Sequence, residues 1–310
     1  MAALNEQPER THLTQRFARL GFGAFSVVGY SVAGEETVVQ VPELGICFDA
    51  GRAPQFALTS DILCLSHAHM DHVAGIAYYA SQRFFQGMKP PVVLLPHEIR
   101  DAVADVLAAF GRLERQETPY QLVPMRPGEL HKVRADFGIR CHRTHHGGPS
   151  LAFSAVQIRR KLKDEFHGKS GDEIVQLKKG GVEIQYTVEV PLVTYTGDTA
   201  DGDVFDEPDL YEAQVLLTEC TFFDDGHRRK AKAGRHLHVR QFAEILPTLE
   251  CEHVVILHVS RRTGVQRAKR TLRDLVGDDE MRRVHFLMDF KGSVRVGDAA
   301  KASEGGSLET

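Results

Sequence analysis

Apolar residues are gathered along this chain in short runs, which glycine, proline and charged residues separate. Three runs between residues 22 and 49 are rich in β-branched and aromatic side chains, which predicts antiparallel hairpins: FSVVGYSV, ETVVQV and GICFD. Six later runs are almost continuously apolar: DILCLS (61–66), PVVLLP (91–96), LVTYTGD (192–198), VLLTEC (215–220), HVVILHVS (253–260) and RVHFLM (283–288). Runs of this length and composition are typical of buried strands.

Helical periodicity appears between these runs. HEIRDAVADVLAAFGRL (97–113) places Ile99, Val103, Leu107 and Phe110 on one face, which predicts an amphipathic helix. Three more segments are expected to be helical: VAGIAYYASQRFF, HVRQFAEILPTL and QRAKRTLRDLV. The order of elements, β-rich at first and then mixed, occurs twice, which indicates an α/β sandwich.

Two segments depart from this order. The stretch with Pro124 and Pro127 is expected to be a loop, and the strand GIRCHRTHHGG that follows it ends in histidines. Residues 157–185 are charged, rich in lysine and arginine, and weakly apolar, which indicates an inserted arm. The expected organisation is one domain, residues 18–296, with this arm and with flexible ends at residues 1–17 and 297–310, where little can be buried.

Composition and cysteine usage indicate a cytoplasmic protein. With 310 residues, 42% of them hydrophobic and 26% charged, the chain can bury a sizeable core. The five cysteines are widely spaced and form no Cys-x-x-Cys pair, which favours reduced thiols over a disulfide framework. The polar N-terminal stretch lacks the apolar core of a signal peptide. No apolar run approaches the roughly 18 residues that span a bilayer.

Three histidines and an aspartate lie within six positions of LSHAHMDHVAG (65–75), where a buried strand is expected to meet a helix. In an extended segment that enters a turn, residues i and i+2 point the same way, so His67 and His69 can bind one ion together. Asp71 and His72 lie past the bend and can face a second ion. Imidazole and carboxylate groups are the ligands of zinc and similar ions. A polar loop with exposed histidines is the alternative, which the buried character of both flanks disfavours.

Three later strand ends offer further ligands. They carry His145 or His146 in CHRTHHGG, Asp198 in LVTYTGDT and His258 in VVILHVS. Taken singly, each residue has an ordinary explanation, because a histidine after a strand is often a surface residue and an aspartate in Gly-Asp-Thr is often a turn former. Together with HAHMDH they indicate a metal centre.

The pattern H-x-H-x-D-H, a distant histidine, a Gly-Asp-Thr and a late strand-end histidine resembles the metallo-β-lactamase superfamily. Seven pieces point to one branch of it, the ribonuclease Z (tRNA 3′-end endonuclease) family in its plant-type short form: FDAGRAP, SHAHMDHVAG, RKLKDEFHGKSGDEI, YTGDT, TECTFFDD, HLH and ILHVS. The resemblance spans about residues 20–290. It implies a four-layer αββα sandwich with a short inserted arm. It also implies a homodimer in which the arm of one subunit holds the RNA that the other subunit cuts.

The resemblance further implies the cofactors and their ligands. The cofactors are two divalent metal ions, Zn2+ in the first place, although the same ligand types also accept Mn2+ or Fe2+. The family pattern places one ion on His67, His69 and His146, the other on Asp71, His72 and His258, and Asp198 between them. His146 is chosen over His145 because HGGPSLAF is similar to the family's His-x-x-Pro-Ser-x-Gly-Tyr, although it ends here in Ala-Phe.

The implied activity is endonucleolytic removal of the 3′ trailer from precursor tRNA. Two ions about 3.5–4 Å apart can bind both the attacking and the departing oxygen of a phosphodiester, and Asp71 is expected to orient the attacking water. The family's His-Glu-Ala-Thr motif corresponds to TECT (218–221), which keeps the carboxylate and lacks the histidine. The family's catalytic histidine corresponds to His236, which with Glu219 behind it is expected to protonate the departing oxygen. A surface carboxylate is the alternative for Glu219, and His238 is expected to cap a helix or lie on the surface.

Local clusters of basic residues must carry any RNA binding, because the formal net charge is −4 and dedicated nucleic-acid binders usually have a basic balance. The family's arm that clasps tRNA corresponds to residues 159–181, with Arg159, Arg160, Lys161, Lys163, Lys169, Lys178 and Lys179. A second cluster leads into His236: Arg228, Arg229, Lys230, Lys232 and Arg235. A solvated charged face and a mobile basic loop are the ordinary alternatives. The implied partner is precursor tRNA, and neither DNA nor a membrane is expected.

Two other functions are compatible with the same residues. A hydrolase of a small phosphodiester, ester or lactone would use the same ligands and would not need a basic arm. A metal-bearing RNA-binding protein without enzymatic activity would have no need of the proton donor that His236 and Glu219 provide. Removal of residues 159–181 distinguishes the first alternative, and Asp71→Ala distinguishes the second.

Overall fold

Two seven-stranded β-sheets form the centre of the computed structural model, which describes residues 17–290. The first sheet contains, in spatial order, β1 (Ala18–Phe22), β2 (Phe25–Val32), β3 (Glu36–Val41), β4 (Ile46–Phe48), β5 (Ile62–Cys64), β6 (Val92–Pro96) and β7 (Gln121–Met125). The second sheet contains, in the same way, β8 (Leu130–Arg134), β9 (Phe137–Arg143), β10 (Leu151–Leu162), β11 (Gln185–Tyr195), β12 (Val215–Glu219), β13 (His253–Leu257) and β14 (Val284–Phe286).

Each sheet begins with antiparallel strands and ends with parallel ones. In the first sheet β1 to β4 pair antiparallel, and β4 to β7 pair parallel. In the second sheet β8 to β11 pair antiparallel, and β11 to β14 pair parallel. The expected order, β-rich and then mixed, twice over, is therefore confirmed. Parallel strands are buried on both faces, which explains why the runs around β5, β12 and β13 are continuously apolar.

The two sheets pack face to face through one apolar core. Val39 and Phe48 of the first sheet belong to the same buried cluster as Phe153 and Tyr195 of the second. The rings of Phe48 and Tyr195 lie 5.1 Å apart between their centroids, which is contact distance for aromatic side chains.

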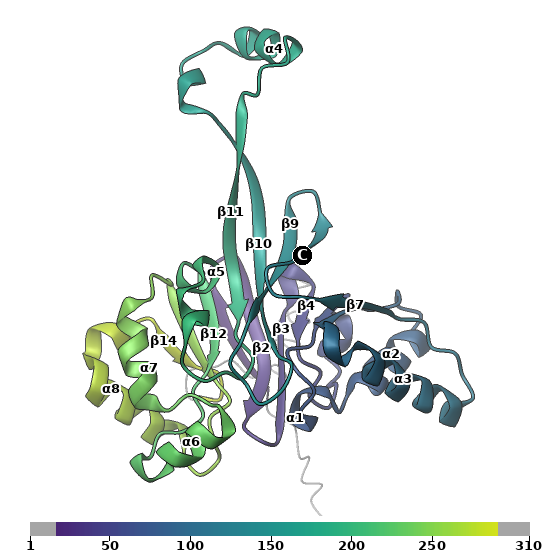
Figure 1. Ribbon diagram of the computed structural model, residues 1–310, viewed down its shortest axis with the longest axis vertical. Coiled ribbons are helices and arrows are strands. Elements are labelled where there is room, and N and C mark those ends of the chain that lie inside the picture. Colours follow the sequence, from purple (N-terminus) through teal and green to yellow (C-terminus); the bar gives the residue numbers. More distant parts are fainter. Residues whose placement is uncertain (1–16, 291–310) are drawn as a thin grey trace, which may run out of the picture.

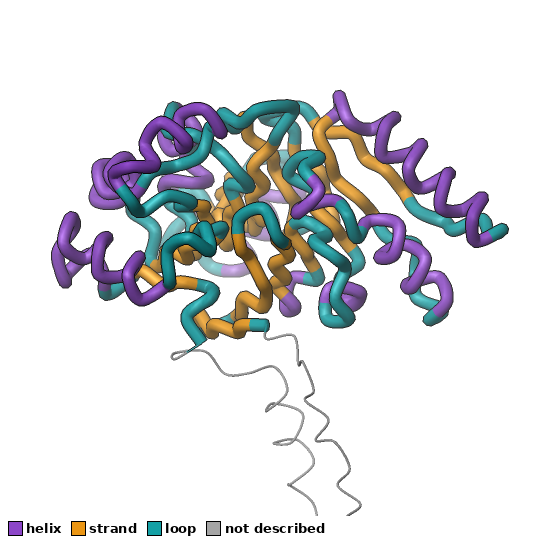
Figure 2. Tube along the Cα trace, turned by 90° about the horizontal axis from the view of Figure 1, so that it is seen from below, coloured by secondary structure: helices purple, strands orange, loops and turns teal. Residues whose placement is uncertain are grey.

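Helices cover the outer face of each sheet, so the four layers run helix, sheet, sheet, helix (Figure 2). The helices outside the arm are α1 (Met70–Val73), α2 (Ile76–Phe85), α3 (Arg100–Glu114), α5 (Pro208–Tyr211), α6 (Arg228–Gly234), α7 (Val239–Ile245) and α8 (Val265–Met281). On the first sheet, Ile76 and Tyr79 of α2 pack with Leu63. On the second, Phe242 of α7 and Leu272 of α8 pack with the strands. The four-layer αββα sandwich is confirmed.

Two expectations about local structure are wrong. Pro124 lies in β7 and not in a loop; a proline is tolerated there because β7 is an edge strand, where one missing amide donor breaks no ladder. Phe110 does not share the buried face of α3, because its side chain is 49% exposed whereas Val103 and Leu107 are buried. Helices α2 and α3 extend outward from the sheets (Figure 1), so the last turns of α3 have fewer packing partners.

The inserted arm is an extension of the β10–β11 hairpin. The two strands remain paired from Gln157↔Val190 to Leu162↔Gln185, beyond the edge of the sheet, and project from the body of the molecule (Figure 1). Helix α4 (Gly171–Lys179) forms the tip, where Ser170 and Glu173 make a capping box. This helix was not expected from the sequence.

The remaining expectations concern the ends of the chain and its thiols. The flexible ends expected at residues 1–17 and 297–310 lie outside the described residues, apart from Phe17, and so do residues 291–296 of the expected domain. None of the helices between residues 17 and 290 is long and apolar enough to cross a bilayer. All five cysteines are buried and free of disulfides.

Candidate metal centre

A cluster of histidine and aspartate side chains lies at one edge of the two sheets. His67 follows β5, His146 follows β9, Asp198 follows β11 and His258 follows β13 directly. Strand β9 runs in the same direction as β11, because both pair antiparallel with β10. All four residues therefore follow the carboxyl ends of their strands, the edge at which open α/β sheets bind ligands.

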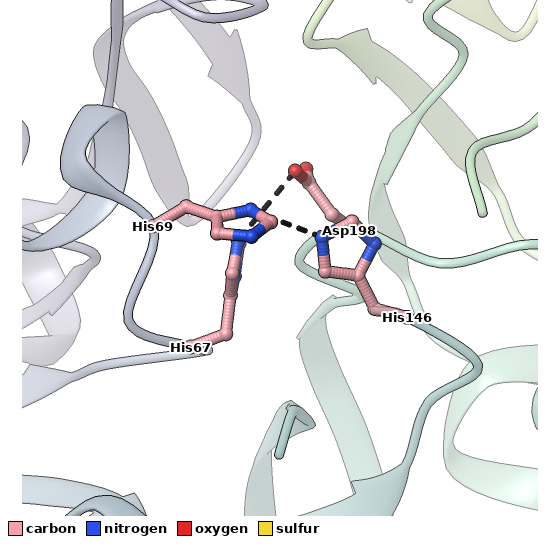
Figure 3. Close-up of side chains that lie close together, drawn as sticks. All are labelled: His67, His69, His146 and Asp198. Carbon is pink, nitrogen blue, oxygen red and sulfur yellow. Dashed lines mark hydrogen bonds and ion pairs between the residues drawn. The ribbon is translucent and has the colours of Figure 1, made fainter. Parts of the chain in front are cut away.

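Four side chains form a first group of possible metal ligands: His67, His69, His146 and Asp198 (Figure 3). Each offers one ligand atom, and these atoms lie within 4.8 Å of one another. The Nε2 atom of His146 lies 3.1 Å from Nδ1 of His69. The Nε2 atom of His67 lies 3.7 Å from Oδ2 of Asp198.

A second group of possible ligands contains Asp71, His72 and His258. Asp71 Oδ2 lies 3.3 Å from His258 Nε2 and 3.7 Å from His72 Nε2. Asp198 stands between the two groups, since its Oδ2 atom is 3.3 Å from His72 Nε2 as well as 3.7 Å from His67 Nε2. One carboxylate thus faces both groups.

Within residues 17–290, two buried nitrogen atoms in the cluster, Nε2 of His67 and Nε2 of His72, have no hydrogen-bond partner. The other ring nitrogens are occupied, His67 Nδ1 by Ser66 Oγ at 2.9 Å and His72 Nδ1 by Asp49 Oδ2 at 2.6 Å. An unpartnered polar atom inside a protein costs about 1–3 kcal/mol. A divalent cation at each group of ligands removes that cost by accepting the lone pair, so the donor set fits a metal site.

The electrostatics of the cluster also suit a cation. Burial, together with the neighbouring imidazole of His72, holds the pKa of His67 well below its ordinary value, which favours the neutral ring that binds metals. Although burial opposes ionisation, the imidazoles of His258 and His72 hold the pKa of Asp198 well below its usual range. Two carboxylates, Asp198 and Asp49, raise the pKa of His72 against the effect of burial. The same negative charge favours a cation at this position.

Asp49 is a buried neighbour of the cluster to which the sequence analysis gave no role. It is completely buried after β4 and accepts hydrogen bonds from Ser66 N and Ser66 Oγ, both at 2.7 Å, and from Tyr195 Oη at 2.6 Å. Its contact with His72 Nδ1 orients that ring. Carboxylates in such positions commonly fix histidine ligands. In the sequence it stands directly after an apolar run, within FDAGRAP, one of the pieces that resemble the family.

Glu219 and His236 form a pair beside the cluster. Glu219 is 1% exposed, so the surface alternative for it is wrong. Its Oε1 atom lies 2.9 Å from His236 Nδ1 and accepts a hydrogen bond from Thr199 N at 2.8 Å. Its Oε2 atom accepts one from Thr221 Oγ1 at 2.6 Å. Burial opposes protonation of His236, but the Glu219 carboxylate raises the pKa of His236 to about 9. The pair places the His236 ring next to Asp198, with Nδ1 3.9 Å from Oδ2.

Two histidines next to predicted site residues, His145 and His238, lie apart from the cluster. His145 turns away from it and pairs with Asp203 at 2.5 Å. His238 is buried at the N-terminus of α7, where its ring accepts a hydrogen bond from Arg240 N at 3.3 Å. The expectation that His238 caps a helix is confirmed, and the surface alternative is wrong.

A cavity of about 410 Å3 opens onto both groups of ligands. The residues that line it are His69, Asp71, Asp198, His236 and His258, together with Ala33, Gly34, Thr221, Phe222, Ser260, Arg261 and Arg262. A volume of this size holds a nucleotide-sized group.

The basic residues predicted to contact RNA lie in two places. On the arm, Arg159, Arg160, Lys161, Lys178 and Lys179 are exposed, while Lys163 pairs with Glu183 at 3.2 Å. In the second cluster, Arg229 and Lys230 are exposed.

Part of the second cluster's charge is engaged within the protein. Arg228 pairs with Asp225 at 2.9 Å, and the Arg235 guanidinium donates a hydrogen bond to the His146 carbonyl oxygen at 2.9 Å. Arg235 therefore braces the loop that carries His146.

Comparison with known proteins first defines the class. Residues 50–259 match the family model described as a beta-lactamase superfamily domain. The metallo-beta-lactamase fold protein YhfI from Bacillus subtilis superposes with a TM-score of 0.57 at 16% identity, covering 83% of this chain and 93% of that one. Human tRNase Z, short form (ELAC1), superposes with a TM-score of 0.53 at 18% identity, covering 76% and 92%. The fold is that of the metallo-β-lactamases.

Sequence comparison then defines the branch. tRNase Z TRZ1 of Arabidopsis thaliana is 34% identical over 245 residues, 78% of this chain and 88% of the relative. The chloroplastic tRNase Z TRZ2 of the same plant is 33% identical over 252 residues, 80% and 71% of the two chains. The nuclear ribonuclease Z of Triticum aestivum is 36% identical over 170 residues, 55% and 97%. The chain belongs to the ribonuclease Z (tRNase Z) family.

Proposed function

We propose that this protein is a metal-dependent endoribonuclease that removes the 3′ trailer from precursor tRNA. The observation that carries the proposal is the convergence, at one cavity, of two groups of metal-ligand side chains with a buried carboxylate–histidine pair. The relatives named tRNase Z support precursor tRNA as the substrate. The free cysteines agree with a reducing compartment such as the cytoplasm.

The cluster would hold two divalent cations, with Zn2+ as the first candidate and Mn2+ or Fe2+ as alternatives. His67, His69 and His146 would bind one of them, and the second group of ligands would bind the other. Asp198 would contact both, which its position between the two groups supports. When bound, such ions activate water and neutralise charge on a phosphodiester.

Asp71 and His236 would act on the two reacting oxygens. Asp71 is partly exposed and lines the cavity, and its Oδ2 atom accepts a hydrogen bond from Gly34 N at 2.8 Å; its carboxylate would orient the attacking water. His236 presents Nδ1 to Glu219, which leaves Nε2 to donate a proton to the departing 3′ oxygen. Glu219 keeps that imidazole protonated and oriented.

RNA would be held by the exposed cations of the arm and of the second cluster, through contacts with phosphates. β10 leaves the cluster's edge of the sheet at Leu151 and β11 returns to it at Tyr195, so the arm projects from the opposite edge. An arm in this position is better placed to serve the site of another subunit than its own.

A homodimer would provide that other subunit. Helices α2 and α3 expose several large apolar side chains: Tyr78 (54%), Phe85 (61%), Val106 (45%), Phe110 (49%) and Leu113 (78%). Val106, Phe110 and Leu113 are spaced by four and three residues, so they form one stripe on α3. Exposed apolar patches of this kind mark interaction sites, and a self-complementary patch is typical of two-fold dimers.

The proposal is tested by incubating the protein with precursor tRNA and, separately, with a chromogenic phosphodiester, each with and without a chelator. Cleavage of the RNA at the 3′ end of the mature sequence, abolished by the chelator, supports it. Cleavage of the small ester alone replaces it with the small-substrate hydrolase. Asp71→Ala should abolish cleavage and leave RNA affinity nearly unchanged; RNA binding without any cleavage by the unmodified protein would favour a binding protein instead.

A further inference from the structure

An ion pair stands at the rim of the second group of ligands. Glu35 lies in the turn between β2 and β3, and Arg261 lies three residues after His258. The guanidinium of Arg261 donates two hydrogen bonds to the Glu35 carboxylate, through Nε and one terminal nitrogen. It also donates one to Tyr30 Oη at 3.2 Å. The pair joins the first sheet to the loop that leaves the second.

The ion pair is the last of three successive links between these two segments. The first is a hydrogen bond from His258 N to Ser31 Oγ at 2.9 Å. The second is a parallel bridge between Val32 and Val259. Arg261 then continues the row to the turn itself. The end of β2 and the segment after β13 are therefore joined at three successive points.

The turn that this row fixes is bonded to Asp71. Gly34, in the same turn as Glu35, donates its backbone N–H to Asp71 Oδ2 at 2.8 Å. The same oxygen lies 3.3 Å from His258 Nε2. Displacement of the turn would thus move Asp71 relative to His258, although neither residue touches the ion pair.

We propose that Glu35 and Arg261 are positioning residues that hold Asp71 and His258 at the separation the second divalent cation requires. The inference rests on the proposed function, because it takes Asp71, His72 and His258 as cation ligands. Neither side chain is needed to bury the core, since Arg261 is 69% and Glu35 34% exposed. Exposed ion pairs add little to folding stability, so the pair's main effect falls on the site.

If charge alone mattered, Arg261→Ala would strengthen metal binding. Replacement of Arg261 by alanine removes a positive charge near the cation and leaves the Glu35 carboxylate unpaired, and both changes attract a cation. Weaker binding in Arg261→Ala therefore reports lost positioning and not lost charge.

The matched control is Arg262→Ala. Arg262 is the next residue in the same loop, it is exposed, and within residues 17–290 its guanidinium makes no hydrogen bond or ion pair. The substitution removes the same charge from nearly the same place and leaves the row of links intact. Arg261→Lys is a second control, because an ammonium group keeps the charge but cannot bind a carboxylate through a planar fork.

The experiment measures zinc affinity by competition with a chromogenic chelator. It also measures kcat and KM on a chromogenic phosphodiester and the melting temperature of the metal-free protein. Arg261→Ala should weaken binding of one of two zinc ions by about 10–100-fold, the usual effect of groups that orient metal ligands. Its kcat should fall, and the melting temperature of the metal-free protein should stay unchanged. The zinc affinity of Arg261→Lys should lie between that of Arg261→Ala and that of the unmodified protein. Arg262→Ala should bind zinc as tightly as the unmodified protein or more tightly.

The exchanged pair, Glu35→Arg with Arg261→Glu, should recover most of the lost affinity, because it restores the link with its polarity reversed. Zinc binding by Arg261→Ala that equals or exceeds that of the unmodified protein would overturn the inference and leave the proposed function standing. Failure of the unmodified protein to bind two divalent cations would overturn the proposed function, and this inference with it.

Discussion

Asp49 shows how one buried side chain outside the ligand set can control the metal site. It accepts four hydrogen bonds, one of them from His72 Nδ1. We expect Asp49→Asn to reduce zinc affinity by about 10–100-fold, because an amide cannot accept all four bonds and frees the His72 ring to turn. Competition with a chelator measures the effect.

Asp203→Asn is the matched control for Asp49→Asn. It removes a carboxylate from another histidine, His145, which lies outside the cluster. Zinc affinity should not change in this variant. Equal losses in the two variants would show that the position of Asp49 is irrelevant to the site.

The Glu219–His236 pair predicts how activity depends on pH. His236 must be protonated to act as the donor, and its pKa is raised to about 9, so this requirement is met below that pH and lost as the pH rises through it. Glu219→Gln removes the carboxylate that raises the pKa of His236. The alkaline fall in kcat on precursor tRNA should therefore begin at lower pH in the variant. An alkaline limb that does not move would exclude His236 as the group that titrates.

At the scale of single residues, the sequence identified the side chains whose partners are close to them along the chain. The four candidate ligand residues in HAHMDH are recognisable because their close spacing along the chain already brings them together. Asp49 and Gly34 have no such signal. Asp49 meets Tyr195 across 146 positions and Gly34 meets Asp71 across 37, so only the folded chain shows what they do.

At the scale of elements, the buried strands were the most predictable part of the fold. A short, continuously apolar run is compatible with few structures other than a buried strand. β7 was missed because a proline usually indicates a loop. A strand tolerates the missing amide donor of Pro124 only at the edge of a sheet, and the sequence does not show that β7 lies there. The tip helix α4 was missed because its residues are charged, and its start depends on the capping box of Ser170 and Glu173 and not on an apolar face.

The arm can be removed as an element. Replacement of residues 159–181 by a short turn leaves the pairing between Phe153 and Tyr195 and the whole metal cluster in place. Cleavage of precursor tRNA should fall by at least about tenfold, since the lost cations supply phosphate contacts and their affinity. Zinc affinity and hydrolysis of a chromogenic phosphodiester should not change.

The point variant Lys178→Glu with Lys179→Glu tests the same idea without shortening the chain. It reverses the charge at the end of α4, where both lysines are exposed. Weaker RNA binding that becomes less sensitive to salt is the expected result. Unchanged cleavage of precursor tRNA in both arm variants would show that the arm has no part in holding the RNA.

At the scale of the whole molecule, the apolar stripe on α3 predicts the state of association. Phe110→Asp with Leu113→Asp should convert a dimer into a monomer, measured by light scattering, because charged groups cannot be buried in a two-fold apolar contact. Leu275→Asp on α8 is the matched control, since Leu275 is also exposed (40%) but lies far from that stripe in the fold. A monomeric unmodified protein would contradict the prediction.

Mixing two inactive variants tests whether an arm serves the site of its partner. Arm-deleted subunits keep an intact metal cluster, and Asp71→Ala subunits keep an intact arm. In a mixed dimer the arm of the second subunit lies beside the intact site of the first, so cleavage of precursor tRNA should reappear on mixing. Random pairing makes about half of the dimers mixed, each with one productive site, which gives about a quarter of the unmodified rate. Since the arm leaves each subunit at the edge opposite its own cluster, an arm that acted within its own subunit would have to fold back across the sheet. Mixtures would then stay inactive, and the dimer would have no part in catalysis.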